Sequence, residues 1–284
     1  MKKNLLIVVI LAVCSIEMVK GQTVADSLAI VSACWKIENF QKGIVYKYAS
    51  IPQLYQGPQS ISLIEIDPVA GLKVGVAVSD KMKETSKIAS EYNAIAAING
   101  SYFDMKRGNS VCFLKADRQI IDTTMQSKFK LRVTGAINVR KGKIKLIPWS
   151  KQIEKEYEGE TGMVLASGPL MLKDGQICDW NSCGANFIRT KHPRSAVATT
   201  KEGKILLITV DGRFPEQAEG VNIPELAHLI RILGGEDALN LDGGGSTTLW
   251  LSGASDDGVV NYPCDNGRFD HAGERKVPNI LYIH

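Results

Sequence analysis

The stretch NLDGGGSTT, residues 240–248, places three consecutive glycines between two short apolar runs, ALNL (238–241) and TTLWL (247–251). Glycine tolerates positive φ and lets backbone approach a ligand closely. Successive N–H groups in such a turn form a concave binding site for an anion. A carboxylate (Asp242), an amide (Asn240) and several hydroxyl groups flank the glycines. The stretch therefore predicts two strands joined by a binding turn, because a turn that only connects two strands needs neither three glycines nor these polar side chains.

Three further segments repeat the pattern of an apolar strand that ends in a polar residue beside glycine. They end at Asn99-Gly100, at Ser167-Gly168 and at Asp211-Gly212. Polar groups at strand ends, beside flexible backbone, commonly line clefts on a rigid sheet. A fifth segment, HPRS at 192–195, leads into a strand through a rigid turn that carries two potential cations. We expect the five segments to meet at one site.

The remaining pattern is one of many strands and few helices. Alternating apolar runs are separated by turn signals such as Asp174-Gly175, which predict hairpins. Strands are expected over 61–66, 73–78, 94–98 and 131–139, and a short helix over 85–92. A second helix is predicted over 224–233, where Asn222 suits the cap and Pro224 the first turn. Strands and helices do not alternate, so we expect an α+β fold: a mixed, largely antiparallel sheet with a few packed helices in a single domain.

The N-terminus fits a secretory signal peptide over residues 1–21. Lys2 and Lys3 form its basic region, and residues 5–13 form an apolar run that is too short to span a bilayer. This leaves an N-terminal extension over 22–60 and the main domain over 61–284. Lipid attachment at Cys14 is the alternative, which the bulky Val13 disfavours. We expect a periplasmic or secreted protein with no transmembrane segment after the signal peptide.

Charge and cysteine content exclude several classes of function. The 284 residues carry a formal net charge of only +4, which is too balanced to indicate binding to nucleic acid or to a membrane surface. The cysteines do not have zinc-ribbon spacing. Cys178 and Cys183 are close enough in sequence to form a disulfide, and the alternative is that the cysteines are small buried apolar residues.

Taken together, five motifs resemble the phosphodiester glycosidase family. They are NGSYFD (99–104), SGPL (167–170), HPRSA (192–196), VDGR (210–213) and NLDGGGSTT (240–248). The resemblance covers residues 94–283, and the last motif is its most specific part. Ser101 departs from the pattern, because a second glycine is expected there, while the aromatic pair Tyr102-Phe103 is kept. Residues 22–60 show no such resemblance.

The resemblance implies hydrolysis of a sugar-1-phosphodiester, of the N-acetylglucosamine-1-phospho-sugar type, at the anomeric C–O bond. The products are free sugar and a phosphomonoester. A phosphate monoester is a weak base, so it departs with little protonation but needs its charge neutralised by arginine and backbone N–H groups. The oxocarbenium-like sugar needs a carboxylate as nucleophile or as base for water. Asp211 and Asp242 are the leading candidates, and Glu225, in the first turn of its helix, is the third.

Substrate binding is expected from residues within the five motifs. These are Asn99, Gly100, Ser101, Gly168, His192, Arg194, Arg213, Asn240, Gly243, Gly244, Gly245, Ser246 and Thr247. Each residue also has a purely structural interpretation. Asp211 and Asp242 can simply complete strand-end turns, and Glu225 can favour its helix dipole. The joint occurrence of the motifs favours a site.

Two other functions are compatible with the same residues. A phosphodiesterase would cleave the P–O bond in envelope glycan polymers, and a non-catalytic module would only bind phosphoglycans. The concentration of carboxylates counts against a pure phosphate binder. The expected partner is a phosphorylated glycan, not nucleic acid. No cofactor is required. A Ca²⁺ or Mg²⁺ ion near Asp211 and Asp242, with Glu225 as a further ligand, is compatible with the sequence but not demanded by it.

Overall fold

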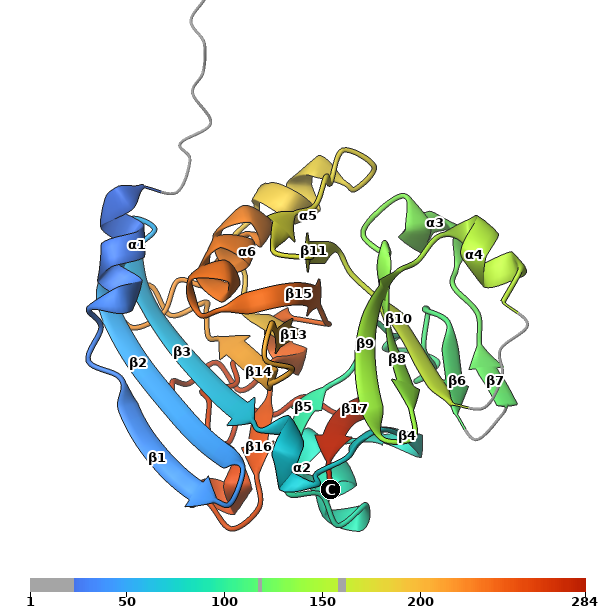
Figure 1. Ribbon diagram of the computed structural model, residues 1–284, viewed down its shortest axis with the longest axis horizontal. Helices are drawn as coiled ribbons and strands as arrows, with labels where there is room; N and C mark the ends of the chain where they lie inside the picture. The colour runs from blue at the N-terminus through green and yellow to red at the C-terminus, as the bar shows by residue number, and fades with distance from the viewer. Residues whose placement is uncertain (1–22, 117–118, 158–161) are drawn as a thin grey trace, which may run out of the picture.

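Three antiparallel sheets pack around a common core and carry short helices on their outer faces (Figure 1). The computed structural model describes residues 23–116, 119–157 and 162–284. The predicted signal peptide and Cys14 lie outside the described residues. Within them, no helix has the length and apolar character needed to cross a membrane. The predicted α+β fold with largely antiparallel sheets is confirmed.

The largest sheet has eight strands in the order β1-β2-β3-β14-β13-β15-β11-β12. In chain order these strands are β1 (Lys36–Gln41), β2 (Ile44–Leu54), β3 (Gly57–Ile66), β11 (Leu170–Lys173), β12 (Gln176–Ile177), β13 (Arg194–Thr200), β14 (Ile205–Val210) and β15 (Gly235–Asn240). The predicted boundary between residues 60 and 61 falls inside β3. The stretch 22–60 therefore contributes strands to the same sheet as the glycosidase-like motifs.

The other two sheets complete the core. The five-stranded sheet has the order β7-β6-β10-β8-β9, and the four-stranded sheet has the order β16-β5-β17-β4. Their strands are β4 (Val74–Lys83), β5 (Ala96–Asn99), β6 (Leu114–Ala116), β7 (Gln119–Asp122), β8 (Gly135–Arg140), β9 (Lys143–Pro148), β10 (Met163–Ser167), β16 (Leu249–Leu251) and β17 (Val277–Ile283). The predicted strand over 131–139 begins only at Gly135. The preceding residues form a turn in which the Arg132 and Val133 N–H groups donate to the Lys128 carbonyl.

The helices are short and lie on the outer faces of the sheets. They are α1 (Val24–Val31), α2 (Thr85–Glu91), α3 (Gln126–Phe129), α4 (Lys151–Lys155), α5 (Ala185–Arg189) and α6 (Ile223–Ile232). Helix α6 begins as predicted, with Asn222 as its cap and Pro224 in its first turn. Its apolar residues pack on the eight-stranded sheet together with Ile30 of α1.

Strand β14 shows why the eight-stranded sheet is rigid. Ile205 and Leu207 face the core that the three sheets share, whereas Leu206 and Ile208 face α6. Every residue of the strand is therefore buried, which explains its continuous apolar sequence. The polar residues that follow β14 and its neighbours are thus attached to a fixed support.

Candidate active site at the glycine turn

The ends of three strands meet beneath the glycine turn, as the sequence predicts. The Asn99 side-chain amide, at the end of β5, donates to the Asp242 carbonyl at 2.7 Å. The Ser167 hydroxyl, at the end of β10, donates to the Asn240 carbonyl at 2.9 Å. Ser195, near the start of β13, donates to the Asn99 side-chain oxygen at 2.6 Å. Segments that lie far apart in the sequence are therefore bonded directly to one another.

The glycines are required by the close contacts of the turn. Gly244 has φ +63°, and its N–H donates to the Pro193 carbonyl at 2.8 Å. A Cβ at position 244 would lie 2.8 Å from Nη2 of Arg213, and one at position 245 would clash with Arg275. The turn thus brings bare backbone against two guanidinium groups, which is how proteins cradle an anion.

The two arginines reach the turn from different segments. Arg213 is exposed, has φ +70°, and places Nη1 3.6 Å from the Cys264 sulfur. Arg275 forms an ion pair with Asp265. Arg213 belongs to the predicted VDGR motif, whereas Arg275 lies in a polar loop where no sequence signal indicated a role.

Arg132 is a third cation that the sequence did not reveal. Its guanidinium carbon lies 3.8 Å from the centre of the Tyr102 ring and 5.0 Å from that of Phe187. Its Nε is buried without a hydrogen-bond partner among the described residues. Position 132 lies within the predicted strand over 131–139. The actual turn at this position brings the side chain to Tyr102.

Asp242 is the carboxylate that accompanies these cations. It is partly exposed. Burial raises the pKa of Asp242, while the Ser246 hydroxyl and the Arg132 guanidinium oppose that rise. Asp242 thus combines access to a ligand with cationic neighbours.

Asp211 has a different environment, although it also ends a strand. It is 0% exposed. Its Oδ2 accepts from the Ser60 hydroxyl at 2.7 Å, and its Oδ1 accepts from the Asn261 side-chain amide at 2.9 Å and the Tyr262 N–H at 3.0 Å. Burial raises the pKa of Asp211 to about 6, against the lowering effect of these hydrogen bonds. Its carboxylate joins β3, β14 and the loop around residue 261.

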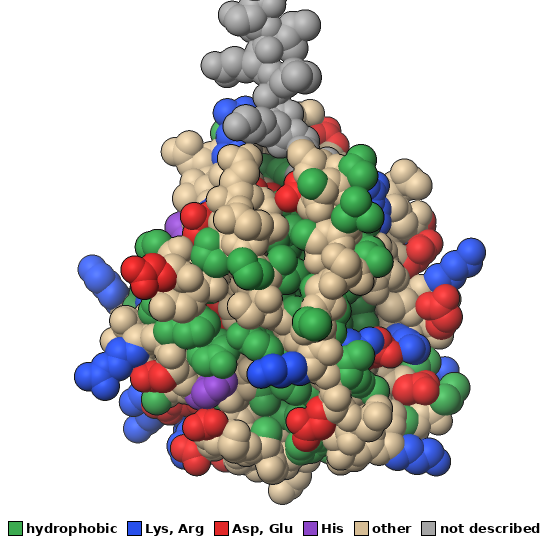
Figure 2. All heavy atoms as spheres, turned by 90° about the vertical axis from the view of Figure 1, so that its left-hand side faces the viewer, with side chains coloured by type: hydrophobic (Ala, Val, Ile, Leu, Met, Phe, Trp, Pro, Cys, Tyr) green, Lys and Arg blue, Asp and Glu red, His purple; other side chains and the backbone are tan. Residues whose placement is uncertain are grey.

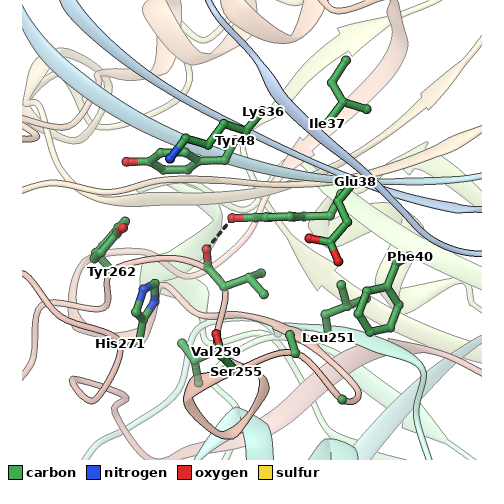
Figure 3. Close-up of a pocket in the computed structure, with 14 residues that line it drawn as sticks. Lys36, Ile37, Glu38, Phe40, Tyr48, Leu251, Ser255, Val259, Tyr262 and His271 are labelled. Carbon is green, nitrogen blue, oxygen red and sulfur yellow. Dashed lines mark hydrogen bonds between the residues drawn. The ribbon is translucent and has the colours of Figure 1, made fainter.

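That loop, residues 259–275, separates the glycine turn from a neighbouring pocket of about 620 Å³. Asn261 bonds Asp211 and the Thr247 carbonyl, while Asp265 and Arg275 lie against Gly245. On the opposite flank, Tyr262 and His271 project into the pocket with Lys36 and Tyr48 (Figure 3). Asn261 is a further residue that the sequence did not single out.

Arg194 and His192 lie close to the site, but Arg194 is largely occupied. Arg194 is only 2% exposed, and it donates to the carbonyls of Val221, Phe187 and Thr190 at 2.9–3.1 Å. Burial lowers the pKa of Arg194 to about 10. Burial also lowers the pKa of His192, with Arg194 and Arg213 adding to the effect. The bonds of Arg194 fix the entry to β13, so its contact with a substrate stays a prediction.

Glu225 lies in the capping box of α6. Its carboxylate accepts from the Asn222 N–H at 2.9 Å, and burial raises its pKa. Both carboxylate oxygens of Asp211 accept hydrogen bonds from Ser60, Asn261 and Tyr262. The carboxylates of Asp211, Asp242 and Glu225 therefore do not combine to bind one ligand. No group of three or more His, Cys, Asp or Glu side chains in the described ranges is arranged to hold a metal ion.

Within these same ranges all five cysteines are free thiols, so Cys178 and Cys183 are not bridged.

Several predicted binding residues support the turn through internal bonds. The Asn240 amide donates to the Tyr102 hydroxyl at 2.8 Å and to the Gly168 carbonyl at 3.0 Å. The Ser101 hydroxyl donates to the Ala166 carbonyl at 2.6 Å. The Gly100 carbonyl accepts from the Asp242 N–H at 3.0 Å. Beside the turn, the buried Thr247 hydroxyl and the Asn240 side-chain oxygen have no partner among the described residues.

Comparisons with known proteins identify the family. A family model described as phosphodiester glycosidase matches residues 92–284. The chain belongs to the phosphodiester glycosidase family, and this places it among the hydrolases. Both the resemblance stated from the five motifs and the expectation of an enzyme are confirmed.

Two similar curated proteins carry the name N-acetylglucosamine-1-phosphodiester alpha-N-acetylglucosaminidase. The Mus musculus protein is 24% identical over 205 residues, covering 66% of this chain and 37% of that protein. The Homo sapiens protein is 24% identical over 222 residues, covering 72% of this chain and 39% of that protein. The chain thus matches about two fifths of the length of these relatives.

A solved structure shares the fold. It is the zebrafish N-acetylglucosamine-1-phosphodiester alpha-N-acetylglucosaminidase catalytic domain, auto-inhibited by its pro-peptide. It has a TM-score of 0.65 and 20% identity, and the match covers 87% of this chain and 85% of that chain. A putative exported protein from Burkholderia pseudomallei matches with a TM-score of 0.51 and 15% identity, over 82% of this chain and 75% of that one.

Proposed function

We propose that the protein hydrolyses the anomeric C–O bond of a sugar-1-phosphodiester and releases free sugar and a phosphomonoester. The observation that carries this proposal is the grouping of Asp242 with the glycine turn and the guanidinium groups of Arg132, Arg213 and Arg275. An anionic leaving group and a cationic sugar centre need opposite charges side by side, and this site has both.

The cations and the turn bind the departing phosphate in this proposal. Arg213 and Arg275 lie against Gly244 and Gly245, so guanidinium N–H groups face the backbone of the turn. Charge-assisted bonds of this kind are about twice as strong as neutral ones. They lower the energy of the phosphate as its negative charge develops, and the reaction therefore does not depend on a strong general acid.

Asp242 is the carboxylate we assign to the reacting sugar, as nucleophile or as base for water. It is the more accessible of the two strand-end aspartates, since Asp211 is fully enclosed. We assign Asp211 a positioning role: it holds Asn261, which in turn bonds the Thr247 carbonyl within the glycine motif. Glu225 is assigned to the cap of α6.

The names of the relatives support a substrate class for this proposal. Their names specify an N-acetylglucosamine-1-phosphodiester, and we propose the same type of bond here, in a phosphorylated glycan met after export. The fold likeness to a putative exported protein and the signal-like N-terminus support export.

A simple assay tests the reaction. The purified protein is incubated with the methyl phosphodiester of N-acetylglucosamine 1-phosphate, and products are separated by ion-exchange chromatography. We expect free N-acetylglucosamine and methyl phosphate. Release of N-acetylglucosamine 1-phosphate would indicate a phosphodiesterase instead, and tight binding without any product would indicate a binding module. A D242N variant serves as the matched control for contaminating hydrolases.

A further inference from the structure

A groove of about 690 Å³ lies between the β8–β9 hairpin and the ends of β13 and β14. Five lysines line it: Lys73, Lys141, Lys143, Lys145 and Lys173. The only carboxylate in its lining is that of Asp237, which already accepts from Lys173 at 2.8 Å. In the described parts of the chain, the other four lysines form no ion pair. The groove therefore carries an uncompensated positive charge.

The hairpin fold gathers these charges. Gly142, with φ +74°, forms the hairpin tip, and a Cβ there would lie 2.7 Å from Cβ and Cγ of Lys73. The Gly142 carbonyl also accepts from the Val74 N–H at 2.9 Å. The stem of Lys73 is thus packed against a tip that has Lys141 and Lys143 on either side.

A further cationic side chain lies at the hairpin. Lys143 is directly opposite Arg140 across its two strands. Elsewhere the surface mixes the two signs, as on the face in Figure 2, where Lys and Arg alternate with Asp and Glu. A local excess of cations in a groove points to an anionic ligand.

We propose that the groove binds an anionic stretch of a phosphate-bearing glycan polymer, of which the glycine turn takes one phosphodiester link. The proposal rests on the proposed function, because it names the substrate of that site as a polymer. Strand β13 runs from Arg194 beside the site to Thr200 in the groove. Six residues of strand correspond to about 20 Å. Because β13 is buried along most of its length, a polymer that gains from both contacts has to pass over the surface and be longer than this span.

The form of the groove favours a polymer over a small anion or a membrane. Lys143 and Lys145 point to the same side of β9, about 7 Å apart. Their ammonium groups are spread point charges, whereas a single phosphate is usually held by converging donors. The charges line a concave surface, which a flat lipid headgroup layer does not enter. Exposed large apolar side chains, which would assist membrane binding, do not occur on the hairpin among the described residues.

The test compares two triple variants of the full chain with equal changes in charge. K141E/K143E/K145E alters the groove, and K42E/K81E/K151E alters exposed lysines elsewhere. Binding to fluorescent phosphorylated dextran, to unmodified dextran and to phosphatidylglycerol vesicles is measured by anisotropy or sedimentation. Turnover of the methyl phosphodiester and thermal unfolding are measured in parallel.

We expect the wild type and the control variant to bind phosphorylated dextran, and the groove variant to bind it at least tenfold more weakly. The affinity of the wild type should fall as salt rises, because exposed charges are screened. Equal losses in both variants, absence of binding to phosphorylated dextran, or binding to vesicles alone would overturn the proposal. Turnover of the small substrate should be unchanged in both variants. If no variant turns it over, the proposed function fails, while the binding comparison still decides the role of the groove.

Discussion

The guanidinium carbon of Arg132 lies 3.8 Å from the centre of the Tyr102 ring. The ring is itself fixed, because the Tyr102 hydroxyl donates to the Gly168 carbonyl at 2.5 Å and accepts from the Asn240 amide at 2.8 Å. Two of the motif strands therefore hold the ring, and the ring holds a planar cation near Asp242. Arginine is suited to this position because its flat group stacks and binds two phosphate oxygens at once.

Replacing Arg132 by lysine should therefore impair catalysis although the charge is kept. The ammonium group does not stack in the same way and lacks the paired N–H groups. We expect kcat/KM for the methyl phosphodiester to fall about 100-fold, in the range typical for loss of one oriented transition-state donor. R231K, on the exposed end of α6, is the matched control and should behave as the wild type. Unchanged kcat/KM in R132K would remove Arg132 from the site.

The two aspartates should respond differently to replacement by asparagine. D242N should lower kcat about 1000-fold or more with little change in thermal stability, because it removes the carboxylate facing the sugar. D211N should remain folded and keep kcat within about tenfold. An asparagine at 211 retains an acceptor for Asn261 and Tyr262 and a donor for Ser60.

D211A separates positioning from catalysis. It leaves the Asn261 and Tyr262 donors without their acceptor and should cost about 1–3 kcal/mol of stability for each buried group left unsatisfied. Its loss of activity should be restored by asparagine but not by serine. Inactive D211N with normal unfolding would instead make Asp211 the reacting carboxylate.

The buried Asp211 also predicts how stability depends on pH. Burial raises its pKa to about 6 from the ordinary value of 3.8, so the folded protein holds this proton more tightly than the unfolded chain does. The resulting stabilisation is fully present below pH 3.8 and is lost as the pH rises through 6. Its size is at most about 3 kcal/mol. Urea unfolding of the wild type and D211N across this range measures it: the difference between them should shift in favour of D211N as the pH rises. A constant difference would contradict the shifted pKa.

The glycine turn is tested by G244A against G267A. The two glycines have similar positive φ, +63° and +72°, but a Cβ at 244 would meet Arg213 whereas one at 267 has no atom within 4 Å. Both alanines carry a backbone cost of about 1–2 kcal/mol. Only G244A should raise KM and lower kcat, because only it displaces a phosphate-binding arginine. Equal effects on kcat and KM in both variants would mean that backbone strain alone explains the result.

Much of the fold follows from local sequence. The cap of α6, the hairpin β13–β14 and the glycine turn are specified by residues close together, so pattern and turn chemistry predict them. The assignment of strands to sheets does not follow. Runs 61–66 and 73–78 are neighbours in sequence, yet β3 joins the eight-stranded sheet and β4 the four-stranded one.

Some residues of the site could likewise be predicted from local sequence, and others could not. Residues next to glycine at strand ends, such as Asn99 and Asp242, carry a local signal. Arg132 and Arg275 lie in ordinary polar segments, and only the tertiary fold brings them to the turn. The burial of Asp211 could not be predicted from the sequence either, because it depends on Ser60 and Asn261, which come from distant segments.

Chelation tests the expectation that no metal is required. We expect kcat to be unchanged after incubation with EDTA and dialysis, because the arginines supply the positive charge. Loss of activity that Ca²⁺ or Mg²⁺ restores would show that a cation takes part.

The central claim is that a sugar leaves its phosphate by cleavage at carbon, with Asp242 on one side and the arginine-lined turn on the other. Hydrolysis of the methyl phosphodiester in ¹⁸O-labelled water, followed at once by mass spectrometry, tests it most directly. A parallel incubation of unlabelled free sugar corrects for exchange at the anomeric carbon. The account predicts the label in the released sugar and unlabelled methyl phosphate. Label in a phosphate product would contradict it.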